Sequence, residues 1–319
     1  MTRPRIPAEL LEAAHARRAA RIAGDWVEAD RLRASIEAAG WRVSDRGRDF
    51  ALAPAHPPDV VEDDRIRYGS SGSVPSCQAE ASTAAASVIL RAADADVGPR
   101  LRALREQVAS AAQVVVVADA PGPEVAASLE RLLAEPSRDA LEVTWTSARL
   151  GPAACLNIAL RRAMGRVLIA LGPAAEPRGN LVGPLAAVLE STDVAVAGMG
   201  GLAGEDVRRL RPVPPGDVAA LDGRCLAVRR DLAALRGPID ERLATWQPLA
   251  IWWSLTLRDE GEGRPPLRAV AIGDLPILEH RADAGERPAD LARLERRDRY
   301  RLLERFGGRP DLFEIGLQV

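Results

Sequence analysis

Lysine is absent from this sequence, so all 43 basic residues are arginine, and aromatic residues make up only 3% of the chain. Together with abundant alanine, the exclusive use of arginine indicates a GC-rich bacterial genome rather than a specialised function. The few cysteines, Cys77, Cys155 and Cys225, lie far apart and form no C-x-x-C pair. We therefore expect neither a zinc site nor a disulfide framework, and we expect a cytoplasmic location.

Long apolar runs are missing as well. The first residues, M-T-R-P-R-I-P-A-E, contain no apolar signal-peptide core, and no run reaches the roughly 18 apolar residues that a membrane span needs. The 319 residues are 47% hydrophobic and 28% charged, with a net charge of −2. This composition supports a sizeable core in about two domains. It excludes a basic nucleic-acid coat protein and gives no sign of membrane binding or insertion.

Residues 1–53 are expected to form a helical hairpin followed by two short strands. Apolar residues recur at helical spacing on both sides of Gly24, and Asp25 with Glu28 three residues later is a capping-box arrangement. The block resembles the C-terminal tail of cysteinyl-tRNA synthetases. The matching residues are Arg17, Arg21, Gly24-Asp25-Trp26, Ala29-Asp30, Leu32-Arg33, Gly40 and Asp45.

This resemblance implies that Arg17, Arg21 and Arg33 are candidates for RNA contact. The alternative, which we favour, is a hairpin whose Asp and Arg side chains cap helices and pair with one another. The block carries only a small excess of Arg over acids, which is weak for binding driven by phosphate charge. The synthetase catalytic signatures H-I-G-H and K-M-S-K-S do not occur, and a nucleic-acid partner is not expected.

The remaining chain divides by composition and pattern. Residues 54–84 are rich in Pro, Gly and Ser and are expected to be a linker. From residue 85 to 285, apolar β-rich runs alternate with helical patterns, which predicts an α/β domain with a mostly parallel sheet and helices on both faces. Residues 286–319 predict an amphipathic helix that packs across the sheet or against a second copy in a homodimer.

Motifs within residues 85–285 resemble, in order, the nucleotide-sugar glycosyltransferases of family 2, which implies the GT-A fold. Ser87–Leu90 matches the first strand, and the run V-V-V-V-A-D-A-P-G, which contains Asp119, matches the second strand and its turn. Further matches are Gly151, Asn157 and Gly165 of a glycine-containing helix, L-D-G-R-C-L-A-V-R-R at 221–230, G-P-I-D-E-R-L at 237–243, and His280.

The resemblance also implies acids that this chain lacks. Family members hold Mg²⁺ or Mn²⁺ on the donor diphosphate through an Asp-x-Asp after the fourth strand, because hard cations bind carboxylate oxygens. Here Gly172 and Ala174 occupy the two Asp positions. An inverting transferase also needs a carboxylate base for the acceptor hydroxyl, and Ala250 stands at that position. We therefore expect no metal cofactor and no metal ligands.

Candidate site residues remain around these gaps. The resemblance implies nucleotide or sugar contacts for a set comprising Asp119, Gly151, Asn157, Glu176, Trp246, Trp252 and His280. Simpler roles stay open, because Asp119 could be an ordinary acid at a strand end, His280 could make a structural hydrogen bond, and the tryptophans could pack on the sheet. If the protein is active, Asp240 or Glu241 is the candidate base, and Glu176 is the acid nearest the diphosphate.

The sequence thus predicts a glycosyltransferase-like protein that is degenerate or inactive and that binds a nucleotide sugar weakly. Two alternatives belong to other classes. One is a non-catalytic sugar-nucleotide-binding or scaffold module that uses the same groove. The other is an RNA- or synthetase-associated module that acts through the N-terminal hairpin.

Overall fold

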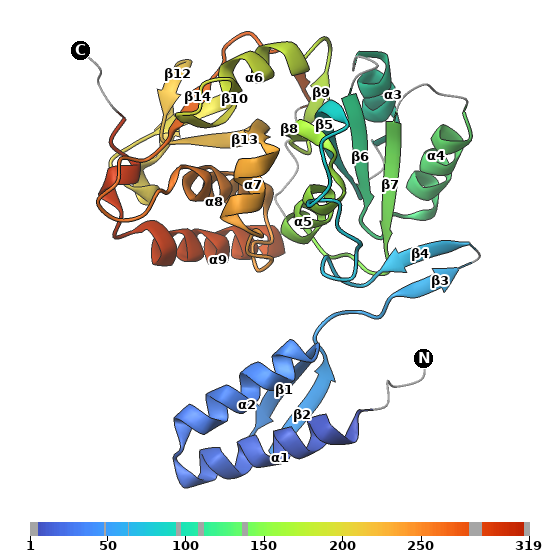
Figure 1. Cartoon of the computed structure of the whole chain (residues 1–319), viewed down its shortest axis with the longest axis vertical. Coiled ribbons are helices and arrows are strands. Elements are labelled where there is room, and N and C mark those ends of the chain that lie inside the picture. The colour runs from blue at the N-terminus through green and yellow to red at the C-terminus, as the bar shows by residue number, and fades with distance from the viewer. Residues whose placement is uncertain are drawn as a thin grey trace. The chain divides into compact units, whose positions relative to one another are not determined.

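The computed structural model describes residues 6–47, 49–62, 64–93, 97–107, 112–135, 140–280 and 289–315. Its chain contacts divide it into two compact units, Met1–Ser70 and Ser71–Val319 (Figure 1). Each unit is described by itself. None of the described helices is long and apolar enough to cross a membrane.

The first unit begins with the expected helical hairpin. Helix α1 (Ala8–Ala23) ends at Gly24, whose φ of 76° is left-handed, and α2 (Trp26–Ala38) follows. The Asp25 side chain accepts a hydrogen bond from the Glu28 backbone N–H at 3.1 Å, which confirms the expected helix cap. Strands β1 (Trp41–Arg46) and β2 (Asp49–Pro54) form an antiparallel pair against the helices.

The stretch that we expected to be a linker contains a second hairpin. Strands β3 (Val60–Glu62) and β4 (Arg65–Tyr68) pair antiparallel. Gly69 follows at a close approach of the backbone, since a Cβ there would lie 1.8 Å from the Pro57 carbonyl oxygen. Composition alone did not indicate this hairpin because its strands are only three and four residues long.

The second unit is built on a mixed, mostly parallel sheet. Strand β5 pairs in parallel with β6 and β8, β6 pairs in parallel with β7, and β13 runs antiparallel between β8 and β10. The sheet order is β12 (Gly216–Val218), β14 (Arg268–Ala271), β10 (Val194–Ala203), β13 (Ala220–Arg229), β8 (Gly165–Leu171), β5 (Ala84–Ala92), β6 (Ala112–Ala118) and β7 (Ala140–Thr146), with β11 (Arg211–Pro212) on β10. Strand β6 is buried along its whole length, as its β-branched run predicts.

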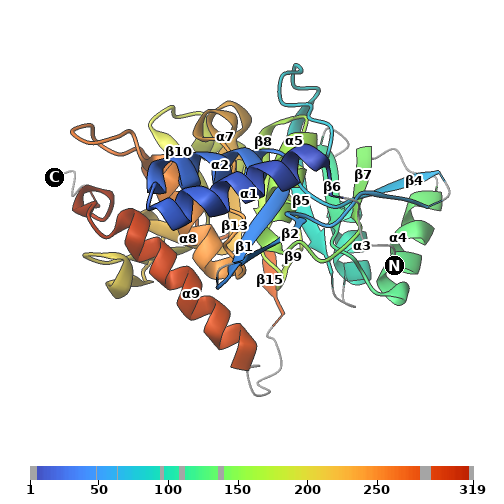
Figure 2. The same cartoon turned by 90° about the horizontal axis from the view of Figure 1, so that it is seen from below.

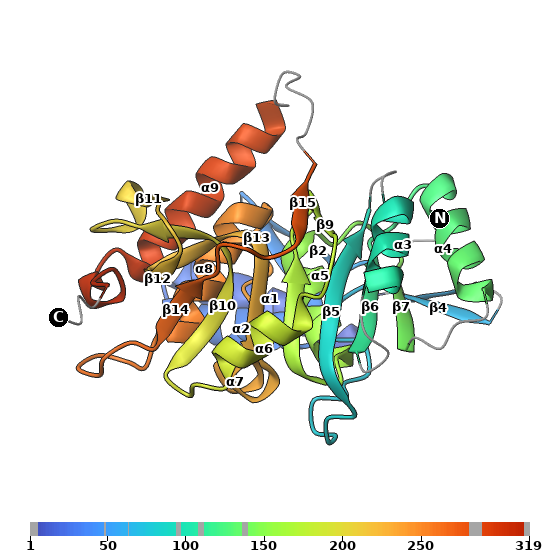
Figure 3. The same ribbon diagram turned by 90° about the horizontal axis from the view of Figure 1, so that it is seen from above.

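Helices cover both faces of this sheet. Helices α3 (Val97–Gln107), α4 (Pro123–Ala134) and α6 (Val182–Leu189) share one apolar core with alternate residues of the strands (Figure 3). The other face receives α5 (Pro152–Arg162), α7 (Arg230–Arg236) and α8 (Trp246–Arg258). This arrangement agrees with the two-faced α/β architecture expected from the alternating pattern.

The C-terminal segment packs on its own chain. Helix α9 (Ala289–Phe306) lies against α8 (Figure 2), and η1 (Val207–Arg209) and η2 (Pro310–Leu312) flank it. Leu302 and Phe306 are each 1% exposed in a cluster with Leu255 and Trp252. Burying each of these large side chains stabilises the fold by about 1.5–3 kcal/mol. The apolar stripe of α9 is therefore used within the chain.

Candidate functional site

The candidate site lies at the carboxyl end of β8, where open α/β sheets bind ligands. The strand ends at Leu171, and a turn leads into β9 (Ala175–Pro177), which pairs antiparallel with β15 (Ile277–Glu279). The turn is held from inside by Arg100, which is 7% exposed. Its Nη2 donates to the Gly172 carbonyl at 2.7 Å, and its Nε donates to the Ala175 carbonyl at 3.0 Å.

Gly172 sits in a space that admits no side chain. A Cβ added there would lie 2.4 Å from the Gly223 carbonyl oxygen and 3.2 Å from Nε1 of Trp246. The Trp246 Nε1–H donates to the same Gly223 oxygen at 2.6 Å, which closes the gap further. The position that the resemblance aligns with a metal-binding acid is thus closely packed against the β13 backbone and an indole ring.

The positions that lack acids lie around one point. A Cβ added to Gly223 would meet the Ala250 methyl at 2.9 Å, so Ala250 adjoins the residue that also contacts Gly172. Ala250 is fully buried. The sequence predicted that these positions belong to one site, and the geometry brings Gly172 and Ala250 together through Gly223.

Glu176 and His280 form the polar part of this edge. Glu176 is 5% exposed, and its carboxylate contacts Nε2 of His280 and, at 2.8 Å, Arg178. The His280 backbone N–H donates to the Ala174 carbonyl at 2.9 Å. The two residues that the sequence placed near the diphosphate are therefore together. The carboxylate already has two cationic or hydrogen-bonding partners.

A second group of charged residues, from β13 and β15, adjoins Glu176 and His280. Arg224 Nε lies 3.1 Å from both Asp222 and Glu279. Burial raises the pKa of Asp222, and the backbone N–H of Arg224 and its guanidinium act in the opposite direction. The edge thus carries Arg178, Arg224 and His280 beside interleaved acids, without a surplus of free carboxylates.

The Asp119 carboxylate accepts hydrogen bonds from other residues of the chain. It is fully buried at the end of β6 and accepts two hydrogen bonds from Arg91, at 2.8 and 2.6 Å. It also accepts from the backbone N–H groups of Leu150 at 2.6 Å and Gly151 at 3.2 Å. Asp119, the residue expected to face a nucleotide, thus holds the loop that starts α5.

Asn157 and Glu241 also contact each other. The Asn157 side-chain amide donates to the Ile239 carbonyl and to Glu241 Oε1, both at 2.9 Å, and accepts from the Ile239 N–H at 2.9 Å. Asp240 is engaged by the neighbouring Arg242, whose hydrogen bond lowers the pKa of the Asp240 carboxyl. The candidate base residues therefore stabilise the loop between α7 and α8.

Trp252 does not join Trp246. Its ring packs edge-on against Phe306, with centroids 6.3 Å apart and planes at 67°, in the cluster between α8 and α9. Trp246 and Trp252, both candidates for nucleotide or sugar contact, therefore lie in different surroundings. On α8 the residues at 246, 250 and 253 share one face, and Trp252 points to another, as helical spacing requires.

A small cavity lies at this edge of the sheet. Leu90, Arg91, Cys155, Leu171 and Trp246 line a cavity of about 10 Å³ between β5, β8 and α5, which is at most the size of one water molecule. The sequence did not indicate the roles of Arg91 and Arg100. Their partners are remote in sequence, and in a chain where every basic residue is arginine no single arginine stands out.

The arginines considered for RNA contact are paired. Arg17 is 6% exposed and binds Asp45 through two hydrogen bonds at 2.8 and 3.2 Å, and Arg21 also contacts Asp45. Arg33 binds Glu37 at 2.8 Å, one turn along α2. The Asp and Arg side chains of the hairpin therefore pair with one another, which was the favoured interpretation.

The residues present do not suit a divalent cation. Across the described ranges no three His, Cys, Asp or Glu side chains gather as metal ligands would. Arg178 and His280 already contact the Glu176 carboxylate, and Arg224 lies against the adjoining Asp222 and Glu279. A hard cation, which binds several oxygen ligands, would compete with these groups for the carboxylates.

Comparison with known proteins identifies the fold. No family model matches the chain, and no curated protein matches it in sequence. Among solved structures, GalNAc-T7 with UDP, GalNAc and Mn²⁺ is similar with a TM-score of 0.53 and 16% identity over 69% of this chain and 48% of that one.

Two further structures have TM-scores of 0.48 and 18% identity. They are the mannosyltransferase PcManGT from Pyrobaculum calidifontis with GDP-Man and Mn²⁺, over 67% of this chain and 61% of that one, and S. aureus TarS, over 68% and 39%. The chain thus covers less than two thirds of each of these three proteins. The second unit has the GT-A-like glycosyltransferase fold, with its mostly parallel sheet between two layers of helices.

Proposed function

We propose that this chain is a glycosyltransferase-fold protein that does not carry out metal-dependent sugar transfer. The observation that carries the proposal is the packing at Gly172, where a Cβ would lie 2.4 Å from the Gly223 carbonyl oxygen. A missing acid could be compensated by a neighbour, but position 172 cannot carry a metal-binding side chain unless the Gly223 backbone or Trp246 moves.

The nucleotide side of the edge supports the same conclusion. Asp119 has no exposed surface and uses its oxygens on Arg91 and on the loop at 150–151. The cavity lined by Arg91 and Trp246 is about 10 Å³, which is by itself too small for a nucleoside, since small-molecule sites are typically ~300–1,000 Å³.

The acceptor side lacks a base. Ala250 is buried at the family's base position, and Asp240 and Glu241 are committed to Arg242 and Asn157. We infer that the protein acts as a non-catalytic module, and that any sugar nucleotide binds weakly and without metal at the cluster of Glu176, Arg224 and His280.

Thermal unfolding with UDP, GDP and their sugars, with and without Mn²⁺, tests this proposal. We expect no stabilisation that depends on Mn²⁺, because a ligand raises the unfolding temperature only if it binds the folded state. Release of UDP or GDP from the sugar nucleotides is followed in parallel by chromatography. A Mn²⁺-dependent rise in unfolding temperature together with turnover of any donor would overturn the proposal. Glu176→Gln and His280→Ala show whether any metal-independent binding occurs at this edge.

A further inference from the structure

A large groove of the second unit lies away from the β8 edge. It is a groove of about 870 Å³ between β12, β14, the loop at 262–267 and the segment at 308–315. This volume is within the range of small-molecule sites. The groove is separate from the glycosyltransferase-type edge and does not depend on the function proposed for it.

Arg258 lies at the floor of this groove. It is the last residue of α8, lines the groove and is 3% exposed. Its Nε donates to the Leu267 carbonyl at 2.7 Å, and its Nη1 donates to the carbonyls of Ala219 at 2.6 Å and Leu312 at 2.5 Å. Nη2 has no hydrogen-bond partner in the described part of the chain, and it is not sealed from solvent.

No carboxylate of the described residues forms an ion pair with this guanidinium. Burial lowers the pKa of Arg258 to about 10, and the negative charges of Asp217 and Asp311 offset only part of that effect. A buried charge without a counter-ion is costly, because neutral carbonyl dipoles replace only part of its hydration. An anion beside Nη2 would therefore stabilise the folded protein.

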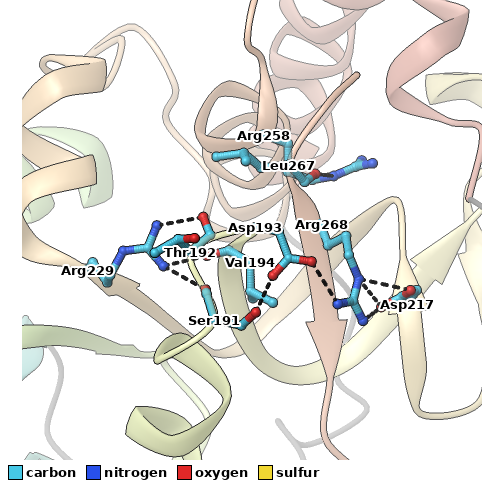
Figure 4. A network of polar contacts seen from close by, with 9 residues as sticks. All are labelled: Ser191, Thr192, Asp193, Val194, Asp217, Arg229, Arg258, Leu267 and Arg268. Atoms are coloured by element: carbon cyan, nitrogen blue, oxygen red, sulfur yellow. Dashed lines mark hydrogen bonds and ion pairs between the residues drawn. The ribbon is translucent and has the colours of Figure 1, made fainter. Parts of the chain in front are cut away.

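The acids on the groove walls are held in ion pairs. Figure 4 shows Arg268 between Asp193 and Asp217, at 3.0 and 2.7 Å. On the opposite wall Arg309 binds Asp311 at 2.8 Å and Asp259, outside the groove lining, at 2.7 Å. Each of these arginines is shared by two carboxylates, and none of the four carboxylates forms an ion pair with Arg258.

Three further charged residues lie on the rim of the groove. Glu262, Arg264 and Glu314 also line the groove, and all three are exposed. Solvent and salt screen exposed charges strongly and buried charges much less. The floor at Arg258 is therefore the position where a counter-charge has the largest effect.

We propose that this groove binds a small molecule through a carboxylate or phosphate group held against Nη2 of Arg258. A guanidinium suits this role because its planar N–H groups match the oxygens of an oxyanion. The groove has room for the rest of a metabolite-sized ligand. The site is a pocket for anionic ligands at strands β12 and β14, apart from the edge of the sheet at which β8 ends.

Thermal unfolding of the full chain tests the site. The probes are inorganic phosphate, succinate and, as a control for ionic strength, sodium chloride. We expect phosphate or succinate to raise the unfolding temperature by several degrees in a saturable way beyond chloride, and the more effective one identifies the anion class. Arg258→Met should abolish this rise. Arg211→Gln, which removes an exposed arginine outside the groove lining, should retain it.

An equal effect of all three salts on the wild type, or a full response in Arg258→Met, would overturn the proposal. The methionine variant leaves three carbonyls without a donor and so could fail to fold. A second measurement therefore uses the wild type alone. Crystals grown with selenate should show an anomalous peak within hydrogen-bonding distance of the Arg258 guanidinium. A peak only elsewhere, or none, would also overturn the assignment.

Discussion

Substitution of Gly172 probes why the family's metal-binding acid is missing. The backbone dihedral φ of Gly172 lies outside the left-handed region, so alanine meets no backbone penalty there, and its cost comes from contact alone. The new Cβ would lie 2.4 Å from the Gly223 oxygen. Relieving such an overlap typically costs about 1–3 kcal/mol.

The shift would also disturb the Trp246 to Gly223 hydrogen bond of 2.6 Å, which is worth about 1 kcal/mol. We therefore expect Gly172→Ala to lower the free energy of unfolding by about 2–4 kcal/mol. Gly172→Asp should cost more, because its carboxylate would approach the carbonyl oxygens of Gly223 and Arg224. Urea denaturation measures the decrease in the free energy of unfolding for both variants, provided that the slope of this free energy against urea concentration is unchanged.

Ala174→Asp is the matched control. It places the same acid two residues further along the turn, at a position that is only half-buried, where substitutions usually change stability by about 0.5 kcal/mol or less. If Gly172→Ala proved as mild as this control, the packing argument would be refuted. Mn²⁺-dependent UDP binding by the double variant with aspartate at both positions would likewise contradict it, since acids alone would then restore the site.

Two further substitutions test polar contacts that hold remote segments together. Asp298→Ala should destabilise the fold by about 3–5 kcal/mol in urea denaturation, because Asp298 is fully buried and accepts from the Ala244 N–H, the Thr245 N–H and the Thr245 hydroxyl at 2.8–2.9 Å. Asp290→Ala, at an exposed position of the same helix, should stay close to the wild type. The hydrogen bond from Arg17 lowers the pKa of Asp45. The ionised Asp45 carboxylate therefore stabilises the folded state fully above the unfolded-state pKa of about 3.9, and this stabilisation is lost as pH falls through the lower folded-state pKa. Asp45→Asn should therefore flatten the stability-versus-pH curve in that acidic window, and an unchanged curve would contradict the assignment.

Much of the fold could be predicted from the sequence because its signals are local. The β-branched run of β6, the helix cap at Asp25 and the glycine at the end of α1 each act within a few residues. The hairpin β3–β4 was missed because its short strands lack a periodic pattern. The order of motifs also identified the edge at which β8 ends.

The site was only partly predictable because its contacts join remote segments. The sequence showed which acids were missing at 172, 174 and 250, but it could not show that the space was filled. That depends on Trp246 and Gly223, and on the clamp that Arg100 forms on a turn more than 70 residues away. Asp119 and Asn157 follow the family pattern in sequence, but in the structure their side chains form hydrogen bonds with other residues of the chain.

The position of Asp298 has a consequence for synthesis of the chain. The backbone N–H groups of Ala244 and Thr245, directly before α8, bind the Asp298 carboxylate, which is 54 and 53 residues further on. During translation the segment that leads into α8 therefore emerges before the carboxylate that holds it. The contact that anchors this segment, next to Trp246, can form only after the part of α9 that carries Asp298 has been made.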